Sequence, residues 1–280
     1  MTHVATLISD PARPALDDAA IAIAVDLPFN PGGADDQAIA QRLRAALAGL
    51  RIDVVVQPLA SRRRRLFVAD MDSTMIGQEC IDELADHVGL KAHVAAITER
   101  AMRGEIAFEP ALRERVALLK GLPVAVVDEV IRERITLTPG ARTLVATMRK
   151  NGGTTCLVSG GFTLFTSRVG AMIGFDENRG NRLVVEDGRL AGRVEEPILG
   201  REAKLATLVE LRDRLGLAAS ETLAAGDGAN DLAMIEAAGL GVAYHAKPKV
   251  ADAAHARIDH SDLTALLYLQ GYARVDFAAL

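Results

Sequence analysis

The sequence predicts an α/β protein in which a doubly wound parallel sheet is interrupted by a helical cap and preceded by a small α+β unit. Three observations favour this fold. From residue 66 onward, short apolar runs that end in polar loops alternate with helical patterns, as parallel strands alternate with their crossover helices. An entirely helical stretch follows the first of these strands. The first 60 residues contain a strand and helix pattern of their own.

The composition is typical of a soluble protein in a reducing compartment. The 280 residues are 50% hydrophobic with a net charge of -5, which suits a large core and disfavours nonspecific binding to nucleic acid or a membrane surface. Cys80 and Cys156 lie in apolar segments without zinc-ligand spacing, so we expect buried, reduced thiols. Residues 1–10 lack a signal-peptide pattern, and no apolar run reaches membrane-spanning length. We therefore expect a cytoplasmic protein.

Residues 1–60 are expected to form a separate, incomplete ferredoxin-like unit. Apolar runs at 4–8, 20–27 and 52–56 predict strands. A helical pattern at 35–50 begins with two aspartates, which suit the positive end of a helix dipole. No group of catalytic residue types occurs in this unit, so the sequence does not indicate what it does.

The arginine run at 62–65 joins this unit to the first strand of the sheet. Four adjacent cations are one way to bind a phosphate-rich partner. A run this short is more commonly a solvated linker or pairs with nearby acids, and we expect that here.

The first functional signal is the end of the strand predicted at 66–69. Asp70 and Asp72 follow this strand, and two hydroxyl residues, Ser73 and Thr74, come next. In an open α/β sheet, ligands bind at this end of the strands. Two crowded carboxylates repel each other unless a cation or a shared proton compensates, which indicates a Mg²⁺ site, a nucleophile beside an acid or base, or both. Taken alone, the stretch is equally compatible with a polar turn.

The segment 78–134 is helical throughout and is expected to form a cap over the strand ends. Apolar residues recur at helical spacing, and glycines and prolines divide the segment into several short helices. The sheet pattern then resumes. We expect helices ending near residues 150 and 173 and one starting near Lys204, strands at 154–158 and 222–225, a hairpin at 182–194 centred on Asp187-Gly188, and β–α alternation to about residue 269.

Three of these strands end in polar side chains. They are followed by Asp70 and Asp72, by Ser159-Gly160-Gly161, and by Asp227 and Asp231. Because parallel strands bring such ends to one edge of a sheet, we expect these groups to converge, with Lys204 reaching the same edge from a helix N-terminus. The glycines match neither a P-loop nor a dinucleotide-binding fingerprint.

The ordered set of motifs resembles that of the haloacid dehalogenase superfamily of phosphatases. The four motifs are Asp70-Met71-Asp72-Ser73-Thr74, Ser159-Gly160-Gly161, Lys204, and Gly226-Asp227-Gly228-Ala229-Asn230-Asp231. The resemblance is closest to members that act on phosphoserine, since it extends to Glu79 and to the stretch 102–108 with Arg113 and Arg115. It covers about residues 66–259. The first 60 residues fall outside it, where related bacterial enzymes often carry regulatory ACT-like units.

The resemblance implies that Asp70 is a nucleophile that attacks phosphorus and forms an acyl phosphate, with Asp72 as general acid and then general base. It also implies a Mg²⁺ cofactor, ligated by the side chains of Asp70 and Asp227 and by the carbonyl of Asp72. Asp231, with Asn230 near it, would orient the water shell of the metal.

The remaining phosphate contacts are implied in the same way. Lys204 would neutralise a phosphoryl oxygen and keep the nucleophile ionised, while Ser159 and the amide of Gly160, followed by Gly161, would bind the other oxygens. Each of these residues also has an ordinary interpretation on its own: a cap for Ser159, and a solvated side chain for Lys204.

In the cap, the resemblance implies that Glu79 binds the substrate ammonium group and that Arg115 clamps its carboxylate, with Met102 and Phe108 as apolar walls. The residues alone leave other interpretations open. Glu79 is also a normal helix-opening acid, and Met102 and Phe108 are also normal core residues. Arg115 is within reach of a pairing with an acid at position 105 or 109.

The implied activity is Mg²⁺-dependent hydrolysis of O-phospho-L-serine to L-serine and phosphate, the last step of serine synthesis. We expect a phosphatase domain at 66–280 with its cap at about 78–135, and a unit at 1–60 that is ACT-like and regulatory or pairs subunits in a homodimer. One rival is the same chemistry on another small phosphate, or transfer to an alcohol. A second is an amino-acid sensor in which the phosphatase part is only a scaffold.

Overall fold

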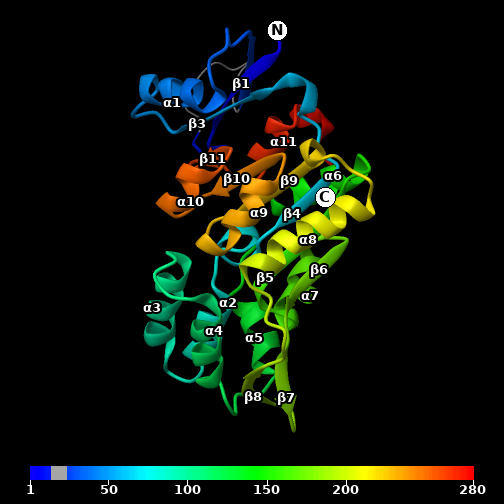
Figure 1. The fold of residues 1–280 in the computed structure, drawn as a ribbon. Helices are drawn as coiled ribbons and strands as arrows, with labels where there is room; N and C mark the ends of the chain where they lie inside the picture. The colour runs from blue at the N-terminus through cyan, green and yellow to red at the C-terminus, as the bar shows by residue number, and fades with distance from the viewer. Residues whose placement is uncertain (14–23) are drawn as a thin grey trace.

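A computed structural model of the chain describes residues 1–13 and 24–280, and it has the α/β architecture that the sequence predicts (Figure 1). The centre is a six-stranded sheet with the order β11-β10-β9-β4-β5-β6, in which neighbouring strands are parallel. The strands are β4 (Leu66–Ala69), β5 (Thr154–Phe162), β6 (Glu177–Asn181), β9 (Thr222–Gly226), β10 (Leu240–Tyr244) and β11 (Ala256–Ile258).

Helices cover both faces of this sheet. They are α6 (Ala141–Lys150), α7 (Thr163–Ile173), α8 (Arg201–Arg214), α9 (Leu232–Ala237), α10 (Pro248–Ala253) and α11 (Ala265–Leu269). On β4, Phe67 and Ala69 belong to the core cluster that includes α6, α7 and α11, whereas Leu66 and Val68 belong to the cluster that includes α8 and α9. Burial on both faces explains why this strand is a continuous apolar run in the sequence.

Four helices form the cap between β4 and α6, and the helices expected at 78–134 are thereby confirmed. They are α2 (Cys80–Asp86), α3 (Lys91–Met102), α4 (Phe108–Ala117) and α5 (Val126–Glu133). The hairpin of β7 (Leu183–Glu186) and β8 (Arg189–Val194) packs against them at the same end of the molecule (Figure 1). The N–H of Gly121 donates to Leu190 O at 2.8 Å, and the N–H of Leu190 donates to Leu122 O at 2.9 Å. The sequence predicted the hairpin but not this attachment to the cap.

The N-terminal unit lies at the opposite end of the sheet from the cap (Figure 1). It is an antiparallel sheet with the order β2-β1-β3, made by β1 (His3–Ser9), β2 (Ala24–Phe29) and β3 (Ile52–Pro58), and α1 (Asp36–Ala46) packs on it. The predicted strand at 20–27 begins among residues 14–23, which lie outside the described residues. The predicted helix was too long, because α1 ends at Ala46 and Gly49 has a positive φ of 93°.

The arginine run is not the solvated linker that the sequence suggested. The side chains of Arg62 and Arg64 are buried, with relative exposures of 9% and 5%. Arg62 pairs with Asp26 at 2.7 Å and donates to two carbonyl groups of the α11 segment. Only the alternative, pairing with nearby acids, is correct for Arg62 and for the exposed Arg65, which pairs with Glu221.

Other differences concern element boundaries. The strand predicted at 154–158 continues to Phe162, so Ser159-Gly160-Gly161 lies within β5 and not after it. Its pairing with β6 is irregular between Val158 and Phe162, which is typical of a strand that turns polar groups toward a site. Cys80 and Cys156 are buried free thiols, as expected. Within the described part of the chain, no helix has the length and apolar character needed to cross a membrane.

Candidate active site

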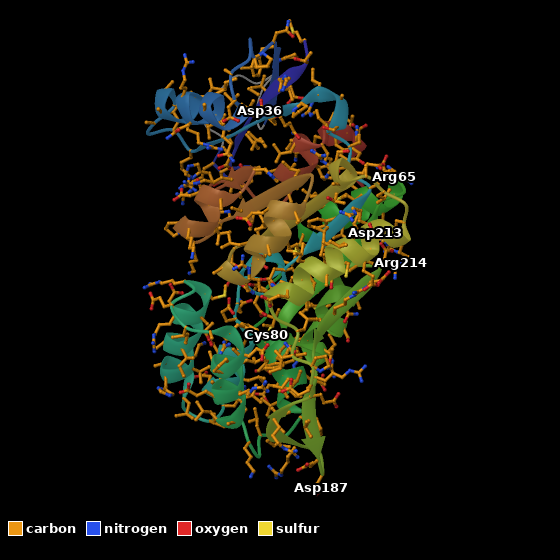
Figure 2. All side chains as sticks on the ribbon, viewed as in Figure 1. Asp36, Arg65, Cys80, Asp187, Asp213 and Arg214 are labelled. Carbon is orange, nitrogen blue, oxygen red and sulfur yellow. The ribbon has the colours of Figure 1, made fainter. Side chains whose placement is uncertain are left out.

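The carboxyl ends of β4, β5 and β9 are adjacent in the sheet and face the cap. Figure 2 marks the junction at Cys80, the first residue of the cap helices. Three buried carboxylates gather here, from Asp70, Asp227 and Asp231. One oxygen of each lies within 4.8 Å of an oxygen of the other two. The convergence that the sequence predicted from strand ends is therefore present in the fold.

Asp70 follows the last residue of β4, and its carboxylate is oriented by two donors. Its Oδ1 accepts a hydrogen bond from the N–H of Met71 at 2.8 Å and lies 2.7 Å from Lys204 Nζ. Within the described residues, Oδ2 accepts no hydrogen bond. Burial raises the pKa of Asp70 well above its usual value, the charge of Asp231 adds to that rise, and Lys204 opposes it. The arrangement holds one oxygen fixed and leaves the other free to react.

Lys204 is fully buried on the first turn of α8 and contacts two acids. Its Nζ lies 2.6 Å from Asp231 Oδ1 as well as 2.7 Å from Asp70. Burial alone would lower the pKa of Lys204, but the charges of Asp231 and Asp70 outweigh burial and raise it. The side chain is therefore a permanent cation, and the solvated alternative considered from the sequence is wrong.

Asp72 lies between β4 and the cap. Its Oδ1 accepts from the N–H of Cys80 at 2.9 Å, and its Oδ2 accepts from Ser159 Oγ at 3.2 Å. Burial raises the pKa of Asp72, although both hydrogen bonds act in the opposite direction. A raised pKa extends the pH range in which the carboxyl group carries a proton, as a general acid requires.

Asp227 follows β9 and accepts hydrogen bonds at both its backbone and its side chain. Its carbonyl accepts from the N–H of Lys247 at 3.0 Å, and Thr74 Oγ1 is 3.4 Å from its Oδ1. Burial raises its pKa to about 7, and the charge of Asp231 contributes to the shift. Asp231 in turn accepts from the N–H of Gly228 at 3.1 Å.

These carboxylates are hard oxygen donors that fit a divalent cation. Of the three buried acids, two contact the ammonium group of Lys204, so a further positive charge would reduce the repulsion among the three. Asn230 Oδ1 is buried nearby without a hydrogen-bond partner among the described residues. An unsatisfied oxygen beside such a cluster is consistent with a polar ligand.

Glycines provide close approach at the site. A Cβ at Gly160 would lie 2.7 Å from the Phe108 ring, and one at Gly161 would lie 2.9 Å from Asp72 Oδ2. A Cβ at Gly228 would lie 2.7 Å from Met102 Cε. The cap side chains Phe108 and Met102 therefore rest directly on the backbone of the sheet motifs, and no side chain would fit between them.

A cavity of about 460 Å³ lies between the sheet edge and the cap. The predicted site residues that line it are Asp70, Asp72, Glu79, Met102, Phe108, Arg115, Ser159, Gly160, Gly161 and Asn230. The other three, Lys204, Asp227 and Asp231, are not among the lining residues, and Lys204 connects to the lining through its ion pair with Asp70. The pocket thus has an acidic end at the sheet and a wall of cap residues opposite.

Two charged groups stand in the cap wall. Glu79 Oε1 accepts from Ser73 Oγ at 2.6 Å, and burial, together with the charge of Asp72, raises its pKa well above the usual value. A cation bound beside Glu79 would favour its charged form. Arg115 is 4% exposed. The predicted alternative in which Arg115 pairs with an acid at position 105 or 109 is wrong, since the described residues provide no ion pair to it.

The sequence analysis missed several residues that hold this site together. Asn181 donates to Gly160 O at 2.7 Å and exchanges hydrogen bonds with the backbone of Leu199, so it links the end of β6 to the glycine motif. Thr98 accepts a hydrogen bond from Arg115 and donates one to Asp82, and the three residues come from three different helices. No sequence signal identifies such residues, because their partners come together only in the folded chain.

Comparisons with known proteins give a consistent family. Residues 67–236 match the sequence model of the haloacid dehalogenase-like hydrolases. The chain is similar to a phosphoserine phosphatase of Polaromonas sp., with 49% identity over 79% of this chain and 96% of the relative. It is also similar to a phosphoserine phosphatase of Archaeoglobus fulgidus, with 43% identity over 87% of this chain and 71% of the relative.

Longer relatives and a solved structure extend this comparison. A phosphoserine phosphatase of Streptomyces coelicolor is 46% identical, and the chain spans 57% of that protein's length. The crystal structure of a HAD family hydrolase from Salmonella enterica serovar Typhi superposes with a TM-score of 0.84 at 30% identity, over 96% of this chain and 98% of that one. This superposition includes the N-terminal unit, which the family model does not cover.

Proposed function

Since this chain belongs to the haloacid dehalogenase-like hydrolases, we propose that it hydrolyses O-phospho-L-serine to L-serine and phosphate. Relatives that are 43%, 46% and 49% identical to it carry the name phosphoserine phosphatase. The observation that carries the proposal is a pocket that has a carboxylate, Asp70, at its sheet end and a buried cation, Arg115, together with an acid, Glu79, in its cap wall. Phosphoserine carries three charged groups. Its phosphate would be attacked by Asp70, its carboxylate would pair with Arg115, and its ammonium group would pair with Glu79.

In the first chemical step, a carboxylate oxygen of Asp70 bonds to phosphorus while the bond from phosphorus to the serine oxygen breaks. The serine oxygen leaves as a hydroxyl group with the proton that Asp72 held. In the second step, water attacks the same phosphorus, passes a proton to Asp72 and releases phosphate from the restored Asp70 carboxylate. The raised pKa of Asp72 supports this role, because it extends the range in which the group carries a proton.

We propose Mg²⁺ as the metal, held by the carboxylates of Asp70 and Asp227 and by the backbone carbonyl of Asp72. When bound, it would supply positive charge that offsets the repulsion between the nucleophile and the phosphate. Asp231 would orient the water shell of the metal, and its ion pair with Lys204 supports a fixed position.

The phosphoryl oxygens would be bound by Lys204, by Ser159 and by the amide of Gly160. Ser159 Oγ accepts from the N–H of Gly161 at 2.8 Å, which holds the hydroxyl group at the pocket lining. Asn230, whose Oδ1 has no hydrogen-bond partner among the described residues, lines the same pocket.

The amino-acid part of the substrate would occupy the cap wall. Glu79 would pair with the ammonium group and Arg115 with the carboxylate, since a guanidinium group can donate two parallel hydrogen bonds to it. Met102 and Phe108 would exclude water, which strengthens both ion pairs.

We further propose that residues 1–60 are an ACT-like regulatory or dimerising unit and that residues 66–280 are the phosphatase domain, with its cap at about 78–135. The separate antiparallel sheet of the N-terminal unit supports this division. The enzyme would complete serine synthesis in the cytoplasm.

A panel of phosphate esters tests the proposed function. Phosphate release from phosphoserine should require Mg²⁺ and stop when EDTA is added. Arg115→Ala should lower kcat/KM for phosphoserine by roughly 100-fold, because it removes a buried charge partner, and it should spare p-nitrophenyl phosphate, which has no carboxylate. Arg113→Ala is the matched control, since this neighbouring arginine is half exposed and pairs with Glu109 and Glu196. An inactive wild type, or equal losses on both esters, would contradict the proposal.

A further inference from the structure

Three helices of the cap are joined by a chain of polar side chains that ends at Arg115. Arg115 on α4 donates from Nη1 to Thr98 Oγ1 on α3 at 2.9 Å. Thr98 Oγ1 donates to Asp82 Oδ1 on α2 at 2.7 Å. All three side chains are at least nine-tenths buried, with exposures of 4%, 3% and 8%. A buried polar chain of this kind costs desolvation, so its members need each other as partners.

The direction of each hydrogen bond in this chain is determined by chemistry. A guanidinium group can only donate, and an ionised carboxylate can only accept. The hydroxyl group of Thr98 must therefore accept from Arg115 and turn its proton toward Asp82. Val94 O, at 3.1 Å from the same hydroxyl group, is the only other acceptor near it in the described residues, and it is farther away than Asp82.

Arg115 has unused donors. A guanidinium group has five N–H bonds, of which Nε donates to Ala111 O at 3.0 Å and Nη1 donates once to Thr98. The remaining three make no hydrogen bond within residues 1–13 and 24–280. Because Arg115 lines the pocket, an anion in the pocket is the partner that these donors lack.

Asp82 balances the charge of Arg115 without touching it. Burial lowers the pKa of Arg115, and Asp82 is the first of the acids whose charge opposes that effect. A direct pairing with Asp82 would occupy two parallel donors of the guanidinium group. With the hydroxyl group of Thr98 between them, Asp82 supplies negative charge and leaves those donors free.

We propose that Thr98 and Asp82 are positioning residues that orient the guanidinium group of Arg115 toward the carboxylate of the substrate. This inference rests on the proposed function, because it assumes a substrate with a carboxylate group. It goes beyond that function by assigning part of the substrate specificity to two residues that act through Arg115: Thr98, at the pocket lining, and Asp82 behind it. The competing explanation is that the three side chains only hold the cap helices together.

Thr98→Val tests the inference, since valine keeps the shape of threonine and removes its hydroxyl group. For phosphoserine we expect KM to rise roughly tenfold with little change in kcat, because the affected contact is remote from phosphorus. For p-nitrophenyl phosphate, which lacks a carboxylate, kcat/KM should stay within about twofold of wild type. Thr98→Ser restores the hydroxyl group and should return KM for phosphoserine to near the wild-type value.

Two further variants complete the experiment. Thr147→Val is the matched control, because Thr147 is also a buried helical threonine but does not line the pocket; it should leave both substrates unaffected. Asp82→Ala removes the acceptor and keeps the hydroxyl group of Thr98. It should raise KM for phosphoserine in the same way, so it tests the inference even if Thr98→Val does not fold.

The outcomes separate this inference from the proposed function. If wild type hydrolyses phosphoserine and Arg115→Ala impairs it, but Thr98→Val and Asp82→Ala change both substrates equally or neither, the positioning role is wrong and the function stands. If wild type does not act on phosphoserine, the proposed function is wrong and the inference falls with it.

Discussion

Lys204 contacts Asp70 and Asp231 at 2.7 and 2.6 Å, and Asp227 completes the cluster of buried acids around it. One ammonium group cannot neutralise three carboxylates, and the charge of Asp231 raises the pKa of both Asp70 and Asp227. The effect is clearest at Asp227, where burial and the charge of Asp231 give a pKa of about 7. The metal-free site therefore retains protons that ordinary aspartates lose near pH 4.

This retention predicts how the metal-free protein responds to pH. An aspartate in the unfolded chain has a pKa of 3.8, whereas the pKa of Asp227 in the fold is about 7, so between these values the folded state binds more protons than the unfolded state. The free energy of unfolding should then fall as pH rises from about 4 through 7, and the raised pKa values of Asp70 and Glu79 act in the same direction. Urea unfolding in EDTA at pH 5 and pH 8 measures this change in the free energy of unfolding.

Two comparisons complete this test. Excess Mg²⁺ should stabilise the protein more at pH 8 than at pH 5, because metal binding favours the ionised carboxylates. Asp227→Asn should weaken the pH dependence in EDTA. Stability that rises with pH in EDTA would show that these carboxylates are ionised without a metal.

Single residues also mark the limit of sequence analysis. Asp70, Ser159, Lys204 and Asp227 were predicted together because they follow a repeated rule, a polar group at the end of a parallel strand or at the start of the next helix. Thr98 was not predicted. It lies in the second half of α3, and its partner Asp82 is 16 residues away in the chain, so only the packing of α2 against α3 joins them.

At the scale of elements, the cap closes on the sheet through aromatic and sulfur side chains that rest on glycine. Phe108 at the start of α4 covers Gly160 in β5, and Met102 at the end of α3 covers Gly228. Lys247 also pairs with Glu99 of α3 at 3.1 Å while its N–H bonds the carbonyl of Asp227. The cap and the sheet motifs therefore determine the pocket jointly.

Gly160→Ala tests this contact. The added methyl group would lie 2.7 Å from Phe108 Cζ, so the ring and the start of α4 would have to move away from the sheet. Overpacking of this size costs about 1–3 kcal/mol, and we expect kcat/KM for phosphoserine to fall roughly tenfold. Steady-state kinetics measure the change.

Gly170→Ala is the matched control for that experiment. Its methyl group would meet Asn178 Cβ at 3.6 Å and Leu157 Cδ2 at 3.8 Å, which are ordinary contact distances, on a helix that does not line the pocket. Activity should be unchanged. If Gly160→Ala is as active as wild type, the contact of Phe108 with β5 is not needed for activity.

At the scale of the whole molecule, the N-terminal unit and the sheet domain share buried polar contacts. Asp53 of β3 accepts hydrogen bonds from the N–H groups of residues 259–261, the shortest at 2.7 Å. The ring of His245 is 3.0 Å from Ser261 O, so the loop that Asp53 holds also contacts the end of β10. Arg62 bridges the same two parts from the linker.

Arg62→Ala should therefore destabilise the molecule as a whole. Arg62 is buried and donates to Asp26, Tyr268 O and Leu269 O, so its removal takes three hydrogen bonds from the junction between the two parts and leaves a gap there. We expect the free energy of unfolding to drop by about 2 kcal/mol, measured by urea unfolding with Mg²⁺ present.

Arg65→Ala, from the same run of arginines, is the control. Its side chain is 62% exposed and pairs with Glu221 at 3.3 Å, so its loss should cost less than about 1 kcal/mol. Equal effects of the two substitutions would mean that the buried contacts of Arg62 do not join the two parts.

The order of elements along the chain was predictable, because each strand and helix has its own periodicity. How the elements dock was not. The four arginines look alike in the sequence, yet two are buried and two are not, and only the position of α11 against β1 and β3 decides which. The attachment of the β7–β8 hairpin to the cap is a long-range contact of the same kind.

The central claim is that Asp70 carries the phosphoryl group during turnover. Quenching the enzyme in acid while it hydrolyses phosphoserine, followed by borohydride reduction and peptide mass mapping, tests it directly, since borohydride reduces an acyl phosphate of aspartate to homoserine. We expect homoserine at position 70, none when substrate is omitted, and no turnover by Asp70→Asn. Homoserine at another position, or full turnover by Asp70→Asn, would contradict it.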